Sequence, residues 1–406
     1  MRVLFTVQPS IGHLHPLVPV AQALVGAGHE VAVCSSPSFR PEVQAFRLPH
    51  IDAGLDWLTA KHSTWGAFPT MPPPGPEFAK FVVTVFADIT TSHMVPDLLR
   101  IAAEWRPDLI VRECMEYGGC LAAEALGIPH VSIAGNGYSA IDSAQVRYFP
   151  GNRAMVAEPM ARHRNKFGLA PDPENLMPFR SLHLCFTPPS WDRGDAPRPA
   201  NTLFLRHVNA NVPGATVPEW VQHLPDRPTI LASLGTVFNS TPGVLEAIIE
   251  GLAFEPVNLV VAIGPDQDPA RFAGAPPNVR LEPYLPQPAL LPHCDLFITH
   301  AGFNSIKESL VSGVPMVAIP ITADQPYCAE RCAALGVARV VLPDERTPEV
   351  IREAALDVLR DPSYRHRTAE FRTQMTELPG PDRVVQLLEG LAPAHNNPGS
   401  FDVAPA

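Results

Sequence analysis

The chain has 406 residues, of which 46% are hydrophobic and 17% are charged, and its formal net charge is −11. A length prior of roughly 100–200 residues per domain predicts two or three domains. The negative charge and the lack of any Lys/Arg run argue against a nucleic-acid-binding protein, so an anionic ligand has to be held by local groups such as helix N-termini.

The start of the chain and its cysteines bear on the compartment. MRVLFTVQPS has one charge and a short apolar run that stops at Pro9, which predicts a buried first strand and not a secretory leader. The sequence contains no run of 18 apolar residues, so no membrane span is predicted. The seven scattered cysteines fit a reducing cytosol better than a disulfide framework. We expect a cytoplasmic protein without stable membrane insertion, and both a monomer and a homodimer stay open.

The N-terminal half alternates short apolar runs with helical stretches. Strands are predicted at 3–7, 30–35, 108–111 and 130–133, and helices at 16–28 and 117–126. This alternation predicts βαβ units and a parallel sheet. Residues 136–200 are less regular and rich in proline and aromatic residues.

The same alternation restarts after a proline-rich stretch. Strands are predicted at 229–233, 257–263, 296–299, 316–319 and 338–342, and a helix at 242–253 with Thr241 as its N-cap. We therefore divide the chain into residues 1–208, a linker at 209–227, a second domain at 228–380, and a C-terminal segment at 381–406. That last segment is expected to hold a helix that returns to the first domain, followed by a flexible tail. Ligands bind beyond the C-terminal ends of parallel strands, so the active site is expected between the two sheets.

The most informative stretch is DLFITHAGFNSIKESLVSGVPMVAIPITADQ, residues 295–325. A buried strand ends at Thr299, Gly302 permits close backbone approach, and a helix is predicted from Asn304–Ser305. The unpaired N–H groups at such a helix start favour an anion, and His300 is placed to donate to a phosphate oxygen. The stretch predicts a diphosphate site.

Two further positions extend this site towards sugars. Glu308 lies one helical turn into the helix, where a carboxylate can accept two hydrogen bonds from a vicinal diol such as ribose. Asp324 and Gln325 lie on a strand-to-helix loop and can hold sugar hydroxyls. Each feature alone is more often structural, but the combined spacing favours a nucleotide-diphosphate-sugar.

This stretch resembles the nucleotide-sugar signature of the family 1 GT-B glycosyltransferases, which include plant UDP-glucosyltransferases and bacterial macrolide and zeaxanthin glycosyltransferases. The signature is His-Gly/Ala-Gly-x-Asn/Gly-Ser/Thr-x-x-Glu, then Gly-Val-Pro, then Asp/Glu-Gln. The matching residues are His300, Gly302, Asn304, Ser305, Glu308, Gly313, Pro315, Asp324 and Gln325. The resemblance spans both halves and is most specific in residues 284–325. It implies an α/β fold of two Rossmann-like domains that face each other across a cleft, with the acceptor on the N-terminal domain and the donor on the C-terminal one.

Other motifs add donor contacts by the same resemblance. Tyr284-Leu285-Pro286-Gln287 is similar to a Trp-x-Pro-Gln motif whose aromatic residue stacks on the base, and tyrosine departs from that pattern. Ser233-Leu234-Gly235-Thr236 is similar to a turn that faces the phosphates. The remaining expected donor contacts are Gly12 and Phe303.

Sugar transfer to a hydroxyl needs a base, and a histidine suits this role because its pKa lies near the working pH. Gly12-His13-Leu14-His15-Pro16 is similar to the family motif Gly-His-x-x-Pro, which implies that His13 is the base and that His15 packs or contacts substrate. A carboxylate usually orients such a base. The family places an aspartate after the strand that begins Pro-Asp-Leu. Here Glu113 stands at that point, and Glu116 is a rival; we favour Glu113.

We therefore expect an inverting, metal-independent transfer of a hexose with no cofactor. Glu308 favours UDP over dTDP, because a buried carboxylate with an unmatched lone pair loses roughly 1–3 kcal/mol. Asp324 and Gln325 suit a fully hydroxylated hexose. UDP-glucose is the favoured donor, and a dTDP-deoxysugar of antibiotic biosynthesis is the alternative.

The acceptor is expected to be a lipophilic natural product bound by aromatic residues of the N-terminal half, although the same residues also suit an ordinary core. The candidates for acceptor contact are Trp65, Phe86, Glu116 and Tyr138.

Other chemistries are less favoured. Asp266-Gln267-Asp268 is the metal-holding pattern of another glycosyltransferase fold, but its proline-flanked position favours a surface turn. His13 and His15 lack a third ligand, as do Cys328 and Cys332, so no metal is expected. A sugar-nucleotide 2-epimerase and an inactive auxiliary binding protein stay open as other classes.

Overall fold

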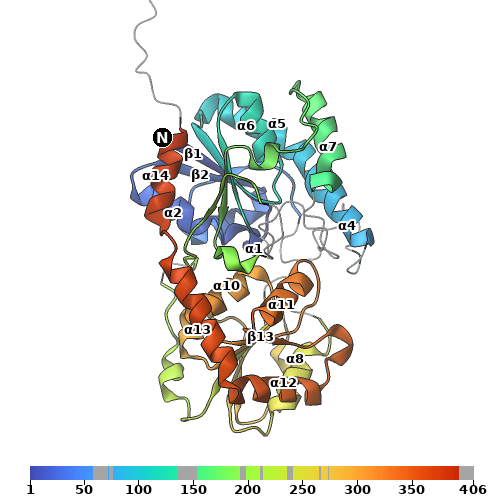
Figure 1. Ribbon diagram of the computed structural model, residues 1–406, viewed down its shortest axis with the longest axis vertical. Helices are drawn as coiled ribbons and strands as arrows, with labels where there is room; N and C mark the ends of the chain where they lie inside the picture. The colour runs from blue at the N-terminus through green and yellow to red at the C-terminus, as the bar shows by residue number, and fades with distance from the viewer. Residues whose placement is uncertain are drawn as a thin grey trace, which may run out of the picture.

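The computed structural model consists of two α/β lobes, one above the other (Figure 1). It describes residues 1–57, 72, 76–135, 153–192, 198–210, 214–235, 241–264, 267–272 and 274–392. Within these residues, the N-terminal lobe has a seven-stranded sheet of order β3-β2-β1-β4-β5-β6-β7 and the C-terminal lobe a six-stranded sheet of order β10-β9-β8-β11-β12-β13. Every strand pair is parallel. The predicted α/β architecture of two Rossmann-like domains is confirmed.

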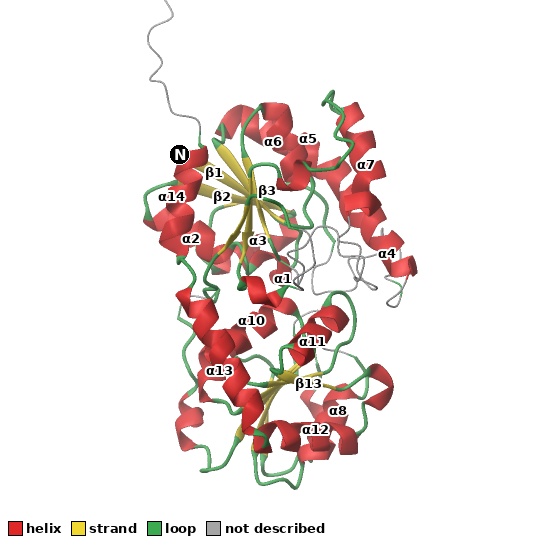
Figure 2. Ribbon diagram, viewed as in Figure 1, coloured by secondary structure: helices red, strands yellow, loops and turns green. Residues whose placement is uncertain are grey.

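The N-terminal sheet is built from buried apolar strands with helices around it (Figure 2). Its strands are β1 (Arg2–Thr6), β2 (Glu30–Ser35), β3 (His50–Asp52), β4 (Leu109–Glu113), β5 (His130–Ile133), β6 (Leu182–Cys185) and β7 (Thr202–Phe204). The helical segments are α1 (Ile11–Leu14), α2 (Val18–Gly26), α3 (Arg40–Ala45), α4 (Pro76–Val82), the π-helical η3 (Val83–Ile89), α5 (Thr90–Trp105), α6 (Gly118–Leu126) and α7 (Arg153–Lys166). All five residues of β4 are buried, as expected of a parallel strand covered on both faces.

The C-terminal sheet repeats this plan. Its strands are β8 (Thr229–Ser233), β9 (Asn258–Ala262), β10 (Val279–Glu282), β11 (Leu296–Thr299), β12 (Met316–Ala318) and β13 (Ala338–Val340). Its helices are α8 (Val244–Leu252), α9 (Gln287–Leu290), α10 (Phe303–Ser312), α11 (Gln325–Ala334), α12 (Pro348–Arg360) and α13 (Pro362–Glu377). The strand order reverses between β8 and β11, as it does between β1 and β4 in the other lobe. Ligands of open parallel sheets bind at such reversals.

The last helix, α14 (Pro381–Leu391), returns to the N-terminal lobe and lies beside α2 (Figure 1). Val384, Val385 and Leu388 are buried in the same core as α2 and β1. Glu389 adds a contact of 3.1 Å to His29. The chain therefore passes between the lobes twice.

Some boundaries differ from those predicted. Helix α2 runs from Val18 to Gly26, two residues shorter at each end than the helix predicted at 16–28, and His13 lies before it on the one-turn helix α1. Helix α8 begins at Val244 and not at 242, because Gly243 adopts the left-handed φ of +80°. Helix α10 begins one residue earlier than predicted, at Phe303. No helix in the described part of the chain has the length and apolar character needed to cross a membrane.

Candidate active site

A cavity of about 320 Å³ lies between the lobes. Its lining includes residues from the loops that follow β1, β4, β8 and β11, which are the strands on either side of the two order reversals. Because the C-terminal ends of parallel strands meet at one edge of a sheet, the fold brings together residues that lie far apart in the sequence.

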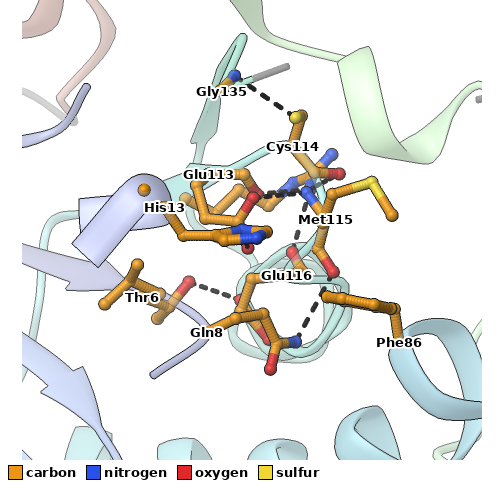
Figure 3. Close-up of polar contacts among 12 residues, drawn as sticks. Thr6, Gln8, His13, Phe86, Glu113, Cys114, Met115, Glu116 and Gly135 are labelled. Atoms are coloured by element: carbon orange, nitrogen blue, oxygen red, sulfur yellow. Dashed lines mark hydrogen bonds and ion pairs between the residues drawn. The ribbon is translucent and has the colours of Figure 1, made fainter. Parts of the chain in front are cut away.

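His13 and Glu113 form a pair in this cavity (Figure 3). Nδ1 of His13 lies 3.1 Å from Oε1 of Glu113, and the backbone N–H of Met115 donates to the other carboxylate oxygen at 2.6 Å. Burial alone would lower the pKa of His13, but the charge and hydrogen bond of Glu113 and the charge of Asp324 raise it above 6.5. A carboxylate that holds Nδ1–H leaves Nε2 to take a proton.

The ring of Phe86 lies against His13. The two rings are nearly parallel, with centroids 6.0 Å apart, and Trp57 packs edge-on against Phe86 at 4.7 Å. Phe86 belongs to the π-helical segment η3, a rare form that often occurs at functional sites. Apolar residues of α4 and η3 form one wall of the cavity: Phe78, Phe81, Val82 and Phe86.

Glu116 lies outside the lining of the cavity. It is fully buried, and its carboxylate accepts hydrogen bonds from Thr6 Oγ1 and from the backbone N–H groups of Gly118, at 2.7 Å, and Gly119, at 2.8 Å. The carboxylate therefore holds the start of α6. This position does not fit the prediction that Glu116 contacts an acceptor, and it is Glu113 that contacts His13.

Arg112 is a residue that the sequence reasoning missed. It is fully buried, and its Nη1 donates to the carbonyl oxygens of Glu113, Cys114 and Glu116, while Nη2 donates to that of Pro178 at 2.6 Å. The guanidinium group therefore fixes the loop that presents Glu113. The sequence did hold a sign of its role: an arginine near the end of an apolar strand that is predicted to be buried must find partners, because an unpaired buried charge is costly.

The imidazole of His300 is enclosed by two glycines. A Cβ on Gly235 would lie 2.7 Å from Cε1 of His300, and a Cβ on Gly302 would also collide with the ring. Gly235 has a φ of +77°, so this position requires glycine for its backbone as well. Burial lowers the pKa of His300 to about 4, so the imidazole is neutral near pH 7.

Helix α10 starts at the cavity. Gly302 is its N-cap and supplies no side chain to the first turn. The first residues, Phe303, Asn304 and Ser305, line the cavity. Backbone N–H groups in the first turn of a helix lack intrahelical partners and favour an anion.

Asn304 also links the two lobes. Its Nδ2 donates to the carbonyl oxygen of Gly12 at 2.7 Å. Gly12 is the neighbour of His13, so the predicted base and the start of α10 share a direct connection. Both residues of this contact were predicted to touch the donor.

Gln287 contacts Glu308. Its Nε2 donates to Oε2 of Glu308 at 2.6 Å and lies 3.2 Å from the hydroxyl of Ser305. Burial raises the pKa of Glu308 to about 7. One of the two carboxylate oxygens is therefore already engaged by an amide. Nearby, Leu285 is buried and the Tyr284 ring is 62% exposed.

Asp324 and Gln325 lie at the start of α11, and both line the cavity. The side-chain oxygen of Gln325 accepts from the backbone N–H groups of Ile321 at 2.8 Å and Thr322 at 2.9 Å, so its amide nitrogen is the group left for a ligand. Ala323, just before this pair, has a left-handed φ of +57°. Such strain in a non-glycine residue is common at binding sites.

Several predicted residues lie outside the described residues: Trp65, Tyr138, Thr236 and Asp266. Ser233 is described and lines the cavity. Among the residues that the structure describes, no group of three or more His, Cys, Asp and Glu side chains could hold a metal ion.

Comparison with known proteins gives the family and the fold. Residues 77–235 and 251–391 match the N-terminal and C-terminal domains described as erythromycin biosynthesis protein CIII-like. The chain is 29% identical over 427 residues to the 10-deoxymethynolide desosaminyltransferase of Streptomyces venezuelae, a match that covers 98% of this chain and 99% of the relative. It is 30% identical over 429 residues to the 4'-demethylrebeccamycin synthase of Lentzea aerocolonigenes, with 96% and 99% covered. The crystal structure of glycosyltransferase VinC in complex with DTDP superposes with a TM-score of 0.76 at 27% identity, over 96% of this chain and 99% of that one.

Proposed function

Because this chain belongs to the erythromycin biosynthesis protein CIII-like family and is a glycosyltransferase of the GT-B fold, we propose that it transfers a deoxysugar from a dTDP-sugar to a hydroxyl of a lipophilic natural product. The observation that carries this proposal is the His13–Glu113 pair, which lines the same cavity as the N-terminus of α10. Transfer from a nucleotide sugar to a hydroxyl needs both a base for the acceptor and a site that stabilises the leaving diphosphate.

The contact between Gln287 and Glu308 supports dTDP over UDP. The sequence favoured UDP because Glu308 was expected to accept hydrogen bonds from both ribose hydroxyls. Gln287 donates to one carboxylate oxygen of Glu308 at 2.6 Å, so a single ribose hydroxyl is enough to give the other oxygen a hydrogen-bond donor. The deoxyribose of dTDP offers one hydroxyl there, so it leaves no donor unmatched.

The relatives support the same donor. One is named a desosaminyltransferase, and the VinC structure is described as a complex with DTDP. Desosamine is a deoxygenated amino sugar. The alternative donor from the sequence, a dTDP-deoxysugar, is therefore better supported than UDP-glucose.

The proposed reaction is an inverting displacement. Nε2 of His13 takes the proton of the acceptor hydroxyl, and Glu113 stabilises the imidazolium that forms. The acceptor oxygen bonds to the anomeric carbon as the bond to the diphosphate oxygen breaks, and the electron pair leaves with dTDP. The first turn of α10 stabilises the developing charge, and Asp324 and Gln325 hold the sugar. The proposal involves no metal.

The cavity wall supports a lipophilic acceptor. Four apolar side chains of α4 and η3 line the cavity, and one of them, Phe86, lies against His13. An aglycone with few polar groups would bury apolar surface here, at roughly 25 cal/mol per Å².

Titration calorimetry with dTDP and UDP tests the donor. We expect the wild type to bind dTDP more tightly, and Gln287→Ala to reduce this preference by roughly two- to tenfold, because Glu308 can then accept both hydroxyls of UDP. The measured quantity is the ratio of the two affinities, since Gln287 belongs to a predicted donor-binding motif and its loss can weaken the binding of both nucleotides. Gln22→Ala, which removes an amide on α2 that bonds the Phe46 carbonyl, is the control and should leave the ratio unchanged. A wild-type preference for UDP would refute the proposed donor.

A further inference from the structure

The cavity holds acids but no permanent cation among its described lining residues. Its ionisable side chains include the carboxylates Glu113, Glu308 and Asp324, and neither lysine nor arginine is among them. Burial lowers the pKa of both His15 and His300 to about 4, so these two are neutral near pH 7. A nucleotide diphosphate nevertheless brings at least two negative charges, and it gains another when it leaves.

Lys307 lies directly behind this lining. It is one helical turn after Phe303 on α10 and is fully buried. Its Nζ lies 4.7 Å from the centroid of the Phe303 ring and 5.9 Å from that of Phe186 in the other lobe. Phe303 itself is among the residues that line the cavity, so Lys307 lies one residue layer from the binding site.

This ammonium group has no hydrogen-bond partner and no ion pair within the described part of the chain. Burial lowers its pKa to about 8, while the carboxylates of Glu308 and Asp324 raise it. The group is therefore still largely protonated at neutral pH. Its charge also contributes to the lowered pKa of His15 and of His207, after the larger effect of burial, so it is felt in the other lobe as well.

A buried, unpaired ammonium group lowers the stability of the protein without its ligand, because the charge has lost its hydration. A bound anion can offset this cost. Charges separated by less than about 10 Å in a protein interior interact more strongly than they do in water, so direct contact is not needed.

We infer that Lys307 is the countercharge for the diphosphate of the donor, and that its charge acts together with the N-terminus of α10. The inference rests on the proposed function, because it takes a nucleoside diphosphate as the ligand. Lys307 would stabilise the bound diphosphate and, more strongly, the additional charge that the diphosphate gains as the sugar leaves.

The test compares wild type with Lys307→Met, which keeps the side-chain length and removes the charge. Calorimetry with dTDP and with thymidine separates the effect on the diphosphate from the effect on the nucleoside. We expect the dTDP affinity to fall about tenfold and the thymidine affinity to stay unchanged. We also expect the melting temperature of the ligand-free variant to rise, because a buried charge has been removed.

Lys166→Met is the matched control. Lys166 also lies over a phenylalanine ring, that of Phe167 at 5.5 Å, but it is exposed on α7. This variant should bind dTDP and thymidine as the wild type does.

The outcomes are distinguishable. Wild-type protein that binds dTDP no more tightly than thymidine would refute the proposed function itself. If the wild type prefers dTDP and Lys307→Met keeps the same preference, Lys307 is not the countercharge. A Lys307→Met variant that is less stable than the wild type, or that does not fold, would also overturn the inference, because the ammonium group would then stabilise the protein.

Discussion

The carboxylate of Glu113 controls the titration of His13. His13 accepts a proton only when it is neutral, and its pKa is raised above 6.5 by the neighbouring carboxylates. We therefore expect kcat/KM to fall as the pH decreases through this raised pKa. Glu113→Gln removes the carboxylate that raises the pKa of His13 most, so the acidic limb should move to lower pH. The maximal rate should fall about 10²–10⁴-fold, because the imidazolium is no longer stabilised.

The measurement is the pH profile of kcat/KM for both proteins. Glu116→Gln is the control: it changes a buried carboxylate on the same loop that does not line the cavity, so its acidic limb should match that of the wild type. An unchanged limb in Glu113→Gln would show that Glu113 does not set the pKa of the base.

A segment of the N-terminal lobe is anchored in the C-terminal lobe beside the donor site. Trp191 is fully buried, with ring centroids 5.5 Å from Phe303 and 6.4 Å from Phe371. Nε of Arg331, on α11, donates to the carbonyl oxygen of Trp191 at 2.7 Å. Because α11 begins at Gln325, this anchor connects the predicted sugar contacts to the opposite lobe.

Trp191→Ala should lower the free energy of unfolding by about 3–5 kcal/mol, the usual range for removal of a buried tryptophan. Urea denaturation followed by circular dichroism measures this change. Trp220→Ala is the control, because Trp220 is only partly buried and lies under Arg280, so its loss should cost clearly less. Equal losses in the two variants would mean that Trp191 is not an anchor.

The elements that the sequence predicted well are those with long apolar runs. Strands β1, β2, β8 and β9 each lie where an uninterrupted apolar segment predicted them. The missed strands are short and carry polar residues, such as β3 with the sequence HID and β6 with LHLC, and their pairing partners are set by tertiary contacts.

The site was predictable where a motif specifies it and not where packing does. His13, Glu113 and the start of α10 followed from spacing and resemblance. Arg112 and Lys307 did not, because a charged residue is usually exposed and nothing local marks these two as buried. The contact between Gln287 and Glu308 joins residues 21 positions apart and altered the expected donor.

At the scale of the whole molecule, the predicted base and the predicted donor site belong to different lobes. His13 follows β1 of the N-terminal sheet, and α10 follows β11 of the C-terminal sheet. The lobes are joined by the Asn304–Gly12 hydrogen bond, by the Trp191 anchor and by the return of α14. Donor binding and proton transfer should therefore be separable by mutation.

His13→Ala tests this separation most directly. Binding of dTDP is measured by calorimetry, and transfer is measured as dTDP release from a dTDP-deoxysugar with a panel of lipophilic hydroxyl acceptors. We predict that dTDP affinity stays close to that of the wild type, while transfer falls about 10²–10⁴-fold, the usual contribution of a general base. Transfer by His13→Ala at a rate near that of the wild type would contradict the assignment of His13 as the base.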